Sequence, residues 1–176
     1  MMDSTHQISL PFMRPGTEPV WKILESVCDP EIPVLSILDL GIVRDVQYTP
    51  EGVLTIVITP TYSGCPAMDM ITMQLKVTLL GHGYKNIHIK TALSPAWTTD
   101  WMTEEGKQKL AAYGIAPPIT KSQSCAATES DEQMAIQCPH CGSYHTEIIS
   151  RFGSTACKAL YKCRDCLEPF DYFKCH

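Results

Sequence analysis

The chain has 176 residues, an apolar fraction of 44% and a formal net charge of −5. This length allows one medium domain and one small unit, and the apolar fraction predicts a hydrophobic core. Lysine and arginine form no cluster, which argues against a protein that binds nucleic acid through its phosphates.

The N-terminus and the cysteines indicate the compartment. The first twelve residues lack the basic and apolar segments of a signal peptide, so we expect none. No apolar run approaches the roughly 18 residues that a membrane span needs, so no membrane partner is expected. Nine cysteines in such a chain predict a cytoplasmic, reducing setting, in which thiols serve metal binding or chemistry rather than disulfides.

Helical and strand patterns alternate in the first half of the chain. Thr17 is placed to cap an amphipathic helix that ends near Pro30. Two β-branched runs, 42–48 and 53–58, are separated by a tight turn and predict an antiparallel hairpin. The next helix, 67–80, is apolar over more than half of its circumference, so we expect neighbouring elements to cover it well.

A third strand is predicted at 86–91, where apolar and polar residues alternate. The order helix, strand, strand, helix, strand predicts a small α/β sandwich with both helices on one face of the sheet. An appendage follows, with a helix from about Thr103 to Gly114. Trp97 and Trp101 in this appendage are either a stacking platform for a base or cofactor or, as we expect, anchors that pin the segment to the core.

Cys65 lies between the second strand and the second helix. Pro66 suits a first helical position, which places Cys65 at the N-cap beside amide N–H groups that lack helical partners. The positive end of the helix dipole favours the thiolate, the form that binds metal or attacks. The alternative is a small buried cysteine that fills a strand-to-helix turn, and position alone does not decide between the two.

A change of composition divides the chain. Residues 117–135 are rich in proline, serine, threonine, glutamine and acidic residues, which is typical of a linker. Cys125 lies within it and is expected to have no structural role. The predicted organisation is an α/β domain at 17–116, a linker at 117–135 and a small β domain at 136–176.

Two Cys-x-x-Cys motifs, 138–141 and 163–166, mark the small domain. Two residues between thiolates let each pair occupy adjacent vertices of a tetrahedron, the geometry of structural zinc. About forty residues bury too little surface to fold without such a metal. We therefore predict a zinc ribbon with four ligands, Cys138, Cys141, Cys163 and Cys166.

The alternative to zinc at these cysteines is iron in a rubredoxin-like site or an iron–sulfur cluster. Cys157, Cys175 and His176 supply spare ligands for such a site, but a zinc ribbon needs none of them. His140 and His145, in and just after the first motif, are expected to be surface residues.

Several motifs resemble known families. Three segments are similar to the metal–sulfur cluster assembly domain of iron–sulfur maturation factors: 29–34 (DPEIPV), 39–43 (DLGIV) and 61–66 (TYSGCP). Four later segments are similar to the D subunits of bacterial phenylacetyl-CoA epoxidases: 95–102 (PAWTTDWM), 113–118 (YGIAPP), 152–160 (FGSTACKAL) and 168–175 (EPFDYFKC). The resemblance covers roughly residues 18–176, apart from the linker.

The resemblance implies a cytoplasmic accessory subunit in phenylacetate breakdown, where a multicomponent oxygenase epoxidises the CoA-activated ring. Its implied partners are the oxygenase or reductase subunits and the iron–sulfur assembly machinery. The implied role is maturation, in which the chain helps to load iron or an iron–sulfur cluster. Cys65 is then the transient thiolate ligand, and Asp29 and Glu31 hold or orient the metal or the partner. The alternative role of this acidic pair is to end the first helix.

Two other functions stay open. A structural or effector subunit would dock on the oxygenase, with zinc holding the docking surface. A thiol oxidoreductase built on Cys138 and Cys141 is the weaker alternative, because a redox motif needs no matching second pair. The chain has no Glu-x-x-His pair and no Gly-x-Gly-x-x-Gly. We therefore expect neither a di-iron carboxylate subunit nor a dinucleotide-binding enzyme, and no catalytic activity of its own.

Overall fold

The computed structural model describes residues 14–119 and 136–174, which form two β-sheets and three α-helices. Most of the predicted linker lies outside the described residues, as do Cys125, Cys175 and His176. Within the described parts of the chain, no helix is both long and apolar enough to cross a membrane.

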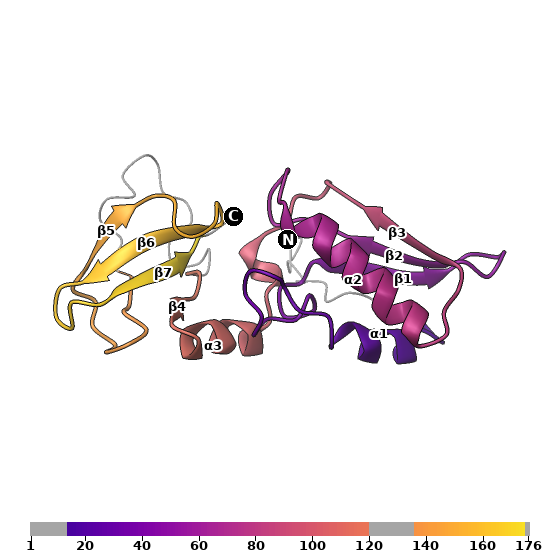
Figure 1. The fold of residues 1–176 in the computed structure, drawn as a ribbon, viewed down its shortest axis with the longest axis horizontal. Helices are drawn as coiled ribbons and strands as arrows, with labels where there is room; N and C mark the ends of the chain where they lie inside the picture. The colour runs from indigo at the N-terminus through magenta and orange to yellow at the C-terminus, as the bar shows by residue number, and fades with distance from the viewer. Residues whose placement is uncertain (1–13, 120–135, 175–176) are drawn as a thin grey trace, which may run out of the picture.

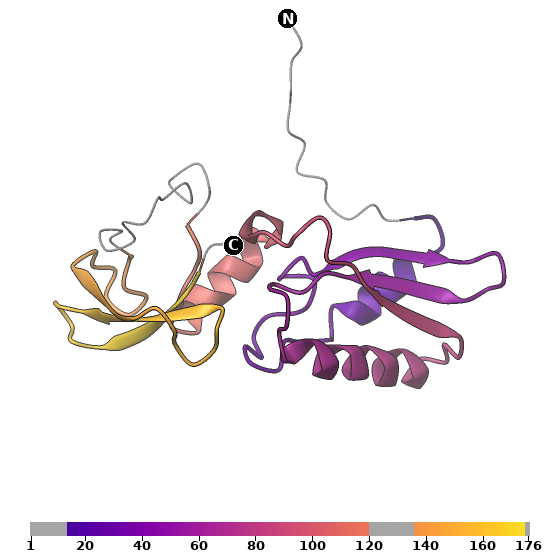
Figure 2. The ribbon, with the colours of Figure 1, turned by 90° about the horizontal axis from the view of Figure 1, so that it is seen from above.

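The first unit contains five elements: α1 (Glu18–Leu24), β1 (Val43–Tyr48), β2 (Leu54–Ile58), α2 (Ala67–Gly81) and β3 (Ile87–Thr91). β1 and β2 pair antiparallel as a hairpin, and β3 runs parallel to β2 after a crossover through α2 (Figure 1). Both helices lie on the same side of this three-stranded sheet (Figure 2). The α/β sandwich predicted from the sequence is confirmed.

Only one face of α2 is buried. Ile71, Leu75 and Leu79 form a row at helical spacing that packs into the core. Four other apolar residues form what we call the α2 methionine face, and each keeps 50–63% of its surface exposed: Met70, Met73, Val77 and Leu80. The expectation that α2 is well covered is therefore wrong for these residues, because the sheet and α1 contact only one side of the helix.

A connecting segment follows β3 and contains η1 (Thr99–Trp101), α3 (Glu104–Ala112) and β4 (Ile115–Ala116). The Thr103 side chain caps α3 by accepting a hydrogen bond from the Gly106 N–H at 2.9 Å. Trp97 is buried, and its indole N–H donates to the Leu40 carbonyl at 2.9 Å. This tryptophan anchors the segment to the first unit, as the sequence predicts.

The second sheet has the order β4-β7-β6-β5. Its three C-terminal strands are antiparallel: β5 (Thr146–Ser150), β6 (Lys158–Cys163) and β7 (Pro169–Phe173). β4 pairs parallel with β7, so residues 115–116, which the sequence assigns to the end of the first unit, supply a strand to the sheet of the second. We call β5–β7 with the four cysteines the ribbon.

The two units share part of a core. The ribbon has its own small buried cluster, which includes Tyr161 and Phe170. Cys157 and Phe173 belong to the ribbon in sequence, yet both are buried in the main cluster of the first unit. The Phe173 ring meets the Trp97 ring edge to face, with 6.2 Å between centroids. The ribbon therefore packs against the first unit rather than standing apart from it.

Candidate metal site and candidate functional cysteine

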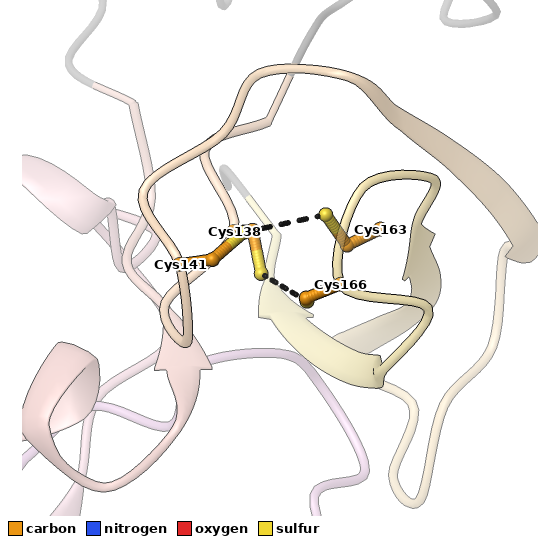
Figure 3. Close-up of side chains that lie close together, drawn as sticks. All are labelled: Cys138, Cys141, Cys163 and Cys166. Carbon is orange, nitrogen blue, oxygen red and sulfur yellow. Dashed lines mark hydrogen bonds between the residues drawn. The ribbon is translucent and has the colours of Figure 1, made fainter.

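The four predicted zinc ligands meet at one place. Within the described residues, Cys138, Cys141, Cys163 and Cys166 are the one group of three or more potential ligands whose atoms all lie within 4.8 Å of one another. The Cys138 and Cys166 sulfurs are 3.7 Å apart, and the Cys141 and Cys163 sulfurs are 3.5 Å apart (Figure 3). Tetrahedral bonds of 2.3 Å to one ion place sulfurs about 3.8 Å apart, so the donor set fits a four-coordinate metal.

Backbone geometry shapes the two Cys-x-x-Cys turns. Gly142 follows the second cysteine of the first motif with φ +76°, and Leu167 occupies the same place after the second motif with φ +67°. Backbone hydrogen bonds, first from Cys166 and then from Asp165, lower the pKa of the Cys163 thiol to about 7. A lowered pKa favours the thiolate, which is the form that binds metal.

Side chains also tie one turn to the other. The Ser143 hydroxyl donates to Asp165, whose other carboxylate oxygen lies 3.0 Å from His145 Nδ1. His145 is largely exposed, and its contact is with this carboxylate rather than with the cysteine sulfurs. Its surface position agrees with the expectation from the sequence.

Cys65 lies in the turn that precedes α2. The helix begins at Ala67 with Pro66 at the N-cap, which moves Cys65 one residue further out than the sequence predicts. The Cys65 backbone N–H donates to the Tyr62 carbonyl at 3.2 Å, and its carbonyl accepts from the Met68 N–H at 3.3 Å. The side chain is half-buried and packs against the main core.

Tyr62 interacts with the Cys65 thiol and with charged groups from two other segments. Burial raises the pKa of Tyr62 to about 12, and the charge of Cys65 together with a hydrogen bond to it adds to this effect. The charges of Cys157 and Glu31 raise the pKa of the same phenol further. Glu31, the turn that carries Cys65 and the ribbon residue Cys157 thus all contribute to the electrostatic surroundings of Tyr62.

The two predicted acidic residues differ in their surroundings. Asp29 Oδ1 accepts hydrogen bonds from the backbone N–H groups of Glu31 and Ile32, both at 2.8 Å, and so holds the turn after α1. Burial and the charge of Asp29 raise the pKa of Glu31, while Lys158 of the ribbon opposes them. Asp29 thus has a visible structural role, and Glu31 is the carboxylate whose pKa is raised.

Cys157 is buried where the ribbon packs against the first unit, and Lys158 is the next residue in the chain. Cys157 is 6% exposed, and its thiol shares a 3.0 Å hydrogen bond with the Thr155 hydroxyl. Burial raises the pKa of Cys157, with Glu31 and Cys65 acting in the same direction. Lys158 is 4% exposed and lies 3.6 Å from the Asp171 carboxylate. No local sequence pattern predicts that Cys157 and Lys158 are buried, because their neighbours come from distant parts of the chain.

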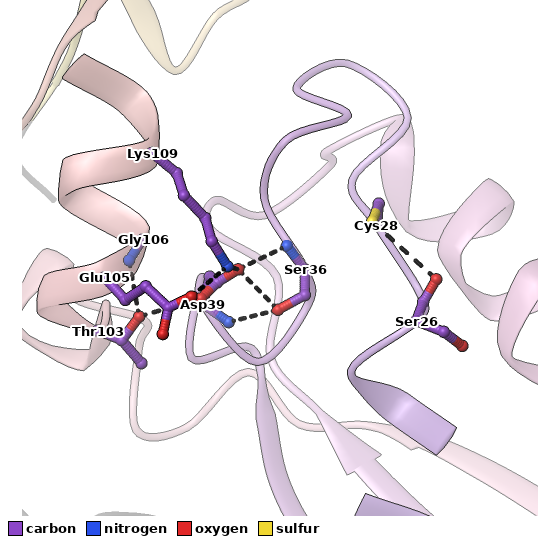
Figure 4. Close-up of polar contacts among 8 residues, drawn as sticks. All are labelled: Ser26, Cys28, Ser36, Asp39, Thr103, Glu105, Gly106 and Lys109. Carbon is purple, nitrogen blue, oxygen red and sulfur yellow. Dashed lines mark hydrogen bonds and ion pairs between the residues drawn. The ribbon is translucent and has the colours of Figure 1, made fainter. Parts of the chain in front are cut away.

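A second polar cluster centres on Asp39, which is 6% exposed (Figure 4). Its carboxylate accepts from the Ser36 N–H at 2.9 Å, the Ser36 hydroxyl at 2.8 Å and the Thr103 hydroxyl at 3.2 Å, and it pairs with Lys109 at 2.9 Å. Burial alone would raise the pKa of Asp39, but Lys109 and Ser36 outweigh it and lower the pKa. A cavity of about 420 Å³ opens beside this cluster, next to Cys28 and Glu105.

Comparisons with known proteins match two parts of the chain to two different family models. Residues 17–83 match the family model of the iron–sulfur cluster assembly protein, and residues 122–174 match that of the PaaD zinc beta ribbon domain. Over 161 residues the chain is 48% identical to an Escherichia coli (strain K12) protein named as the D subunit of a putative 1,2-phenylacetyl-CoA epoxidase. That alignment covers 92% of this chain and 94% of the relative. The chain belongs to this family of epoxidase D subunits.

Other proteins match about half of this chain, and one of them is named as an iron–sulfur maturation factor. A protein of Porphyromonas gingivalis named Fe-S protein maturation auxiliary factor is 34% identical over 94 residues, which is 53% of this chain and 89% of that protein. A crystal structure of a domain of unknown function from Bacillus anthracis is 29% identical and covers 52% of this chain and 88% of that one, with a TM-score of 0.49.

Proposed function

We propose that this protein is a maturation factor of the phenylacetyl-CoA-epoxidising multicomponent monooxygenase, where it assists iron or iron–sulfur cluster assembly and does not itself oxygenate the substrate. The observation that carries this proposal is the match of residues 17–83 to the iron–sulfur assembly family, with Cys65 exposed enough within that unit to meet a cargo. The name of the E. coli relative supports a role in the epoxidase system, and the name of the P. gingivalis relative supports a role in iron–sulfur maturation.

Cys65 supplies the chemistry in this proposal. A thiolate is a soft ligand, which suits iron in a sulfur-rich site. Cys65 lies in the turn one residue before the Pro66 N-cap of α2, and in this proposal the Glu31 carboxylate adds a hard oxygen ligand. Asp29 orients this carboxylate by fixing the backbone N–H of Glu31. The partners are the oxygenase or reductase subunits and the iron–sulfur assembly machinery, in the reducing cytoplasm.

The metal of the ribbon is proposed to be zinc. Four cysteines close the coordination sphere and leave no position for a substrate, which is typical of structural zinc sites. The ribbon cluster around Tyr161 and Phe170 is small, so metal binding is expected to supply much of its folding free energy. In this role zinc holds the ribbon in shape and takes no part in transfer of the cargo.

A docking subunit without metal transfer is the second candidate. The α2 methionine face favours it, because four apolar side chains on one exposed helix face are typical of an interaction surface. A docking role alone gives Cys65 no chemical task. The two candidates therefore differ in what the thiol of Cys65 contributes.

A Cys65→Ser substitution tests the proposal. Serine is close in size to cysteine, so the free energy of unfolding should change by less than about 1 kcal/mol. The host should nevertheless grow poorly on phenylacetate, and the purified epoxidase should contain less iron. The matched control is Cys28→Ser, since Cys28 is a free, half-buried cysteine like Cys65 and its thiol faces the Ser26 carbonyl at 4.0 Å. If the Cys65→Ser host converts phenylacetate at the wild-type rate and its epoxidase has normal iron content, the docking role takes the place of maturation.

A further inference from the structure

A cavity of about 420 Å³ lies where the end of α1, the loop after it and α3 meet. Such a volume is typical of a pocket that takes an organic ligand rather than one water molecule. Neither Cys65 nor any of the four ribbon cysteines lines it. The cavity is therefore separate from the ribbon metal site and from the candidate functional cysteine.

Hydrogen bonds hold the walls of this cavity in place. In the loop after α1, Cys28 and Ser36 face each other in an isolated antiparallel bridge, which two backbone hydrogen bonds of 2.9 Å flank. Ser36 and the Thr103 hydroxyl at the start of α3 both bind the Asp39 carboxylate (Figure 4). The loop and α3 are thus fixed to each other, and the cavity between them is formed before any ligand enters.

Negative charge dominates the lining. Three carboxylates line the cavity, those of Glu25, Asp39 and Glu105, together with one ammonium group, that of Lys109. The Lys109 Nζ lies 2.9 Å from Asp39 Oδ2 and 2.9 Å from Glu105 Oε1, so two carboxylates share one positive charge. Glu25 forms no ion pair within residues 14–119 and 136–174. The lining therefore keeps an excess of negative charge, which favours a cationic ligand.

Apolar side chains restrict the kind of cation. Val34 and Leu38 are half-buried and line the same cavity as the carboxylates. Within the described residues, the cavity carboxylates and the Cys28 thiol do not form a group of ligand atoms within 4.8 Å of one another, which argues against a metal ion. Arginine and lysine side chains combine an apolar stem with a charged head, so they match both the apolar and the acidic parts of the lining.

The acidic groups at the cavity are open to the surface. Glu105 keeps 74% of its side chain exposed, and Glu25 is exposed at the C-cap of α1, where the negative end of the helix disfavours a carboxylate. A cation brought from outside relieves this repulsion. A side chain can reach these carboxylates while the backbone that carries it stays on the surface.

We propose that this cavity binds an arginine or lysine side chain of a partner protein, with its stem against Val34 and Leu38 and its charged head at Glu25 and Glu105. The inference does not depend on the maturation role, because a subunit that only docks on the oxygenase could use the same contact. A free polyamine carries the same chemistry, and the experiment separates it from a partner side chain.

NMR titration of the zinc-loaded full chain tests the inference. Two capped pentapeptides differ only in their central residue, which is arginine in one and citrulline, its uncharged analogue, in the other. The arginine peptide should shift the backbone amides of Ser36, Leu38 and Thr103, with a Kd on the order of 1 mM because one side chain buries little surface. The citrulline peptide should bind at least about threefold more weakly, as expected from the loss of partly exposed ion pairs.

Charge variants locate the binding groups. Glu25→Gln and Glu105→Gln should each weaken binding of the arginine peptide at least about threefold. Glu104→Gln is the matched control, because it removes the same charge from the same turn of α3 but does not line the cavity. Cys28 lines the cavity without a charge, so Cys28→Ser should bind the peptide as the wild type does.

A cavity-filling variant tests the apolar part of the lining. Val34→Phe keeps every carboxylate and occupies the space that the stem of the basic side chain needs, so it should abolish the amide shifts. Zinc content and thermal melting of each variant confirm that the chain is folded. If Val34→Phe itself melts early, the two Glu→Gln variants decide, since both side chains are exposed and their replacement should leave the fold intact.

Three results would overturn the inference. The first is equal affinity for the arginine and citrulline peptides, and the second is a loss in Glu104→Gln as large as that in Glu25→Gln and Glu105→Gln, which would indicate general surface charge. The third is tighter binding of spermidine than of the arginine peptide at the same amides, which would assign the cavity to a free polyamine. Selective loss in the two cavity variants, with spermidine the weaker ligand, supports a partner side chain.

Discussion

Single buried residues connect distant parts of this chain, and Asp39 is the clearest case. Its carboxylate joins the loop after α1 to α3 through Ser36, Thr103 and Lys109. Gly106 permits this approach, because a Cβ there would lie 2.9 Å from the Asp39 Cβ. The cluster therefore fixes α3 against the first unit, and with it the strand β4 that leads to the ribbon.

The charge of Asp39 predicts a loss of stability in acid. Its pKa is lower in the folded chain than in the unfolded one, so its contribution is present above the unfolded value of about 4 and is lost as pH falls through the folded value. Asp39→Asn should lower the free energy of unfolding by about 1–3 kcal/mol at pH 7, because buried donors lose a charged acceptor. The variant should also lose less stability than the wild type between pH 5 and about pH 2.

Urea denaturation at several pH values measures both effects. Asp69→Asn is the control, since Asp69 lies exposed in the first turn of α2 and its loss should cost less than about 1 kcal/mol. If the Asp39→Asn variant is as stable as the wild type at pH 7, the ion pair between Asp39 and Lys109 makes no net contribution to the free energy of unfolding.

Local patterns predicted most of the elements but not their long-range contacts. Hydrophobic periodicity placed α2 and β2 within a residue or two, because both patterns depend on neighbours in sequence. The short strand β4 was missed, since two residues give no periodic signal and its pairing with β7 is non-local. The exposure of the α2 methionine face was not predicted, because the apolar content of a helix does not reveal how many of its sides contact other elements.

The same distinction applies to the candidate site. The four ribbon cysteines were predictable because their spacing itself encodes a tetrahedral site. The burial of Cys157 in the core of the first unit was not, because it follows from how the second sheet packs on that unit. The partners of Asp39 were missed for the same reason, since α3 is distant from Asp39 in sequence.

At the scale of elements, the ribbon strands should depend on the metal while the first sheet does not. One zinc per chain is expected, held by Cys138, Cys141, Cys163 and Cys166. Zinc binding in small domains is worth on the order of 10 kcal/mol, far more than the small ribbon cluster supplies. Removal of the metal should therefore unfold β5–β7 and leave β1–β3 protected.

Elemental analysis and hydrogen exchange measure this dependence. Chelation should speed amide exchange in β6 and β7, and Cys141→Ser should do the same without chelator. Amides of β2, in the middle of the first sheet, serve as the internal reference. Purified chain without zinc, or slow exchange in the ribbon after complete metal removal, would contradict the prediction.

At the scale of the whole molecule, the two units should behave as one folding unit. Chains with a separate zinc ribbon are expected to melt in two steps, because each unit has its own core. Here Phe173 and Cys157 of the ribbon are buried in the core of the first unit, and β4 joins the connecting segment to β7. The shared core and the strand β4 therefore couple the folding of the two units.

The Phe173→Ala substitution tests this coupling. Phe173 is 2% exposed and its ring meets Trp97. Truncation of a buried phenylalanine costs about 3–5 kcal/mol, and here the loss falls on the contact between the units. Calorimetry should show one cooperative transition for the zinc-loaded wild type and two for Phe173→Ala, with the first unit melting near its original temperature. Phe152→Ala is the control, because Phe152 is 69% exposed and its loss should change stability by less than about 0.5 kcal/mol. A wild-type chain that already melts in two steps, or a Phe173→Ala chain that still melts in one, would mean that the contact through Phe173 does not couple the units.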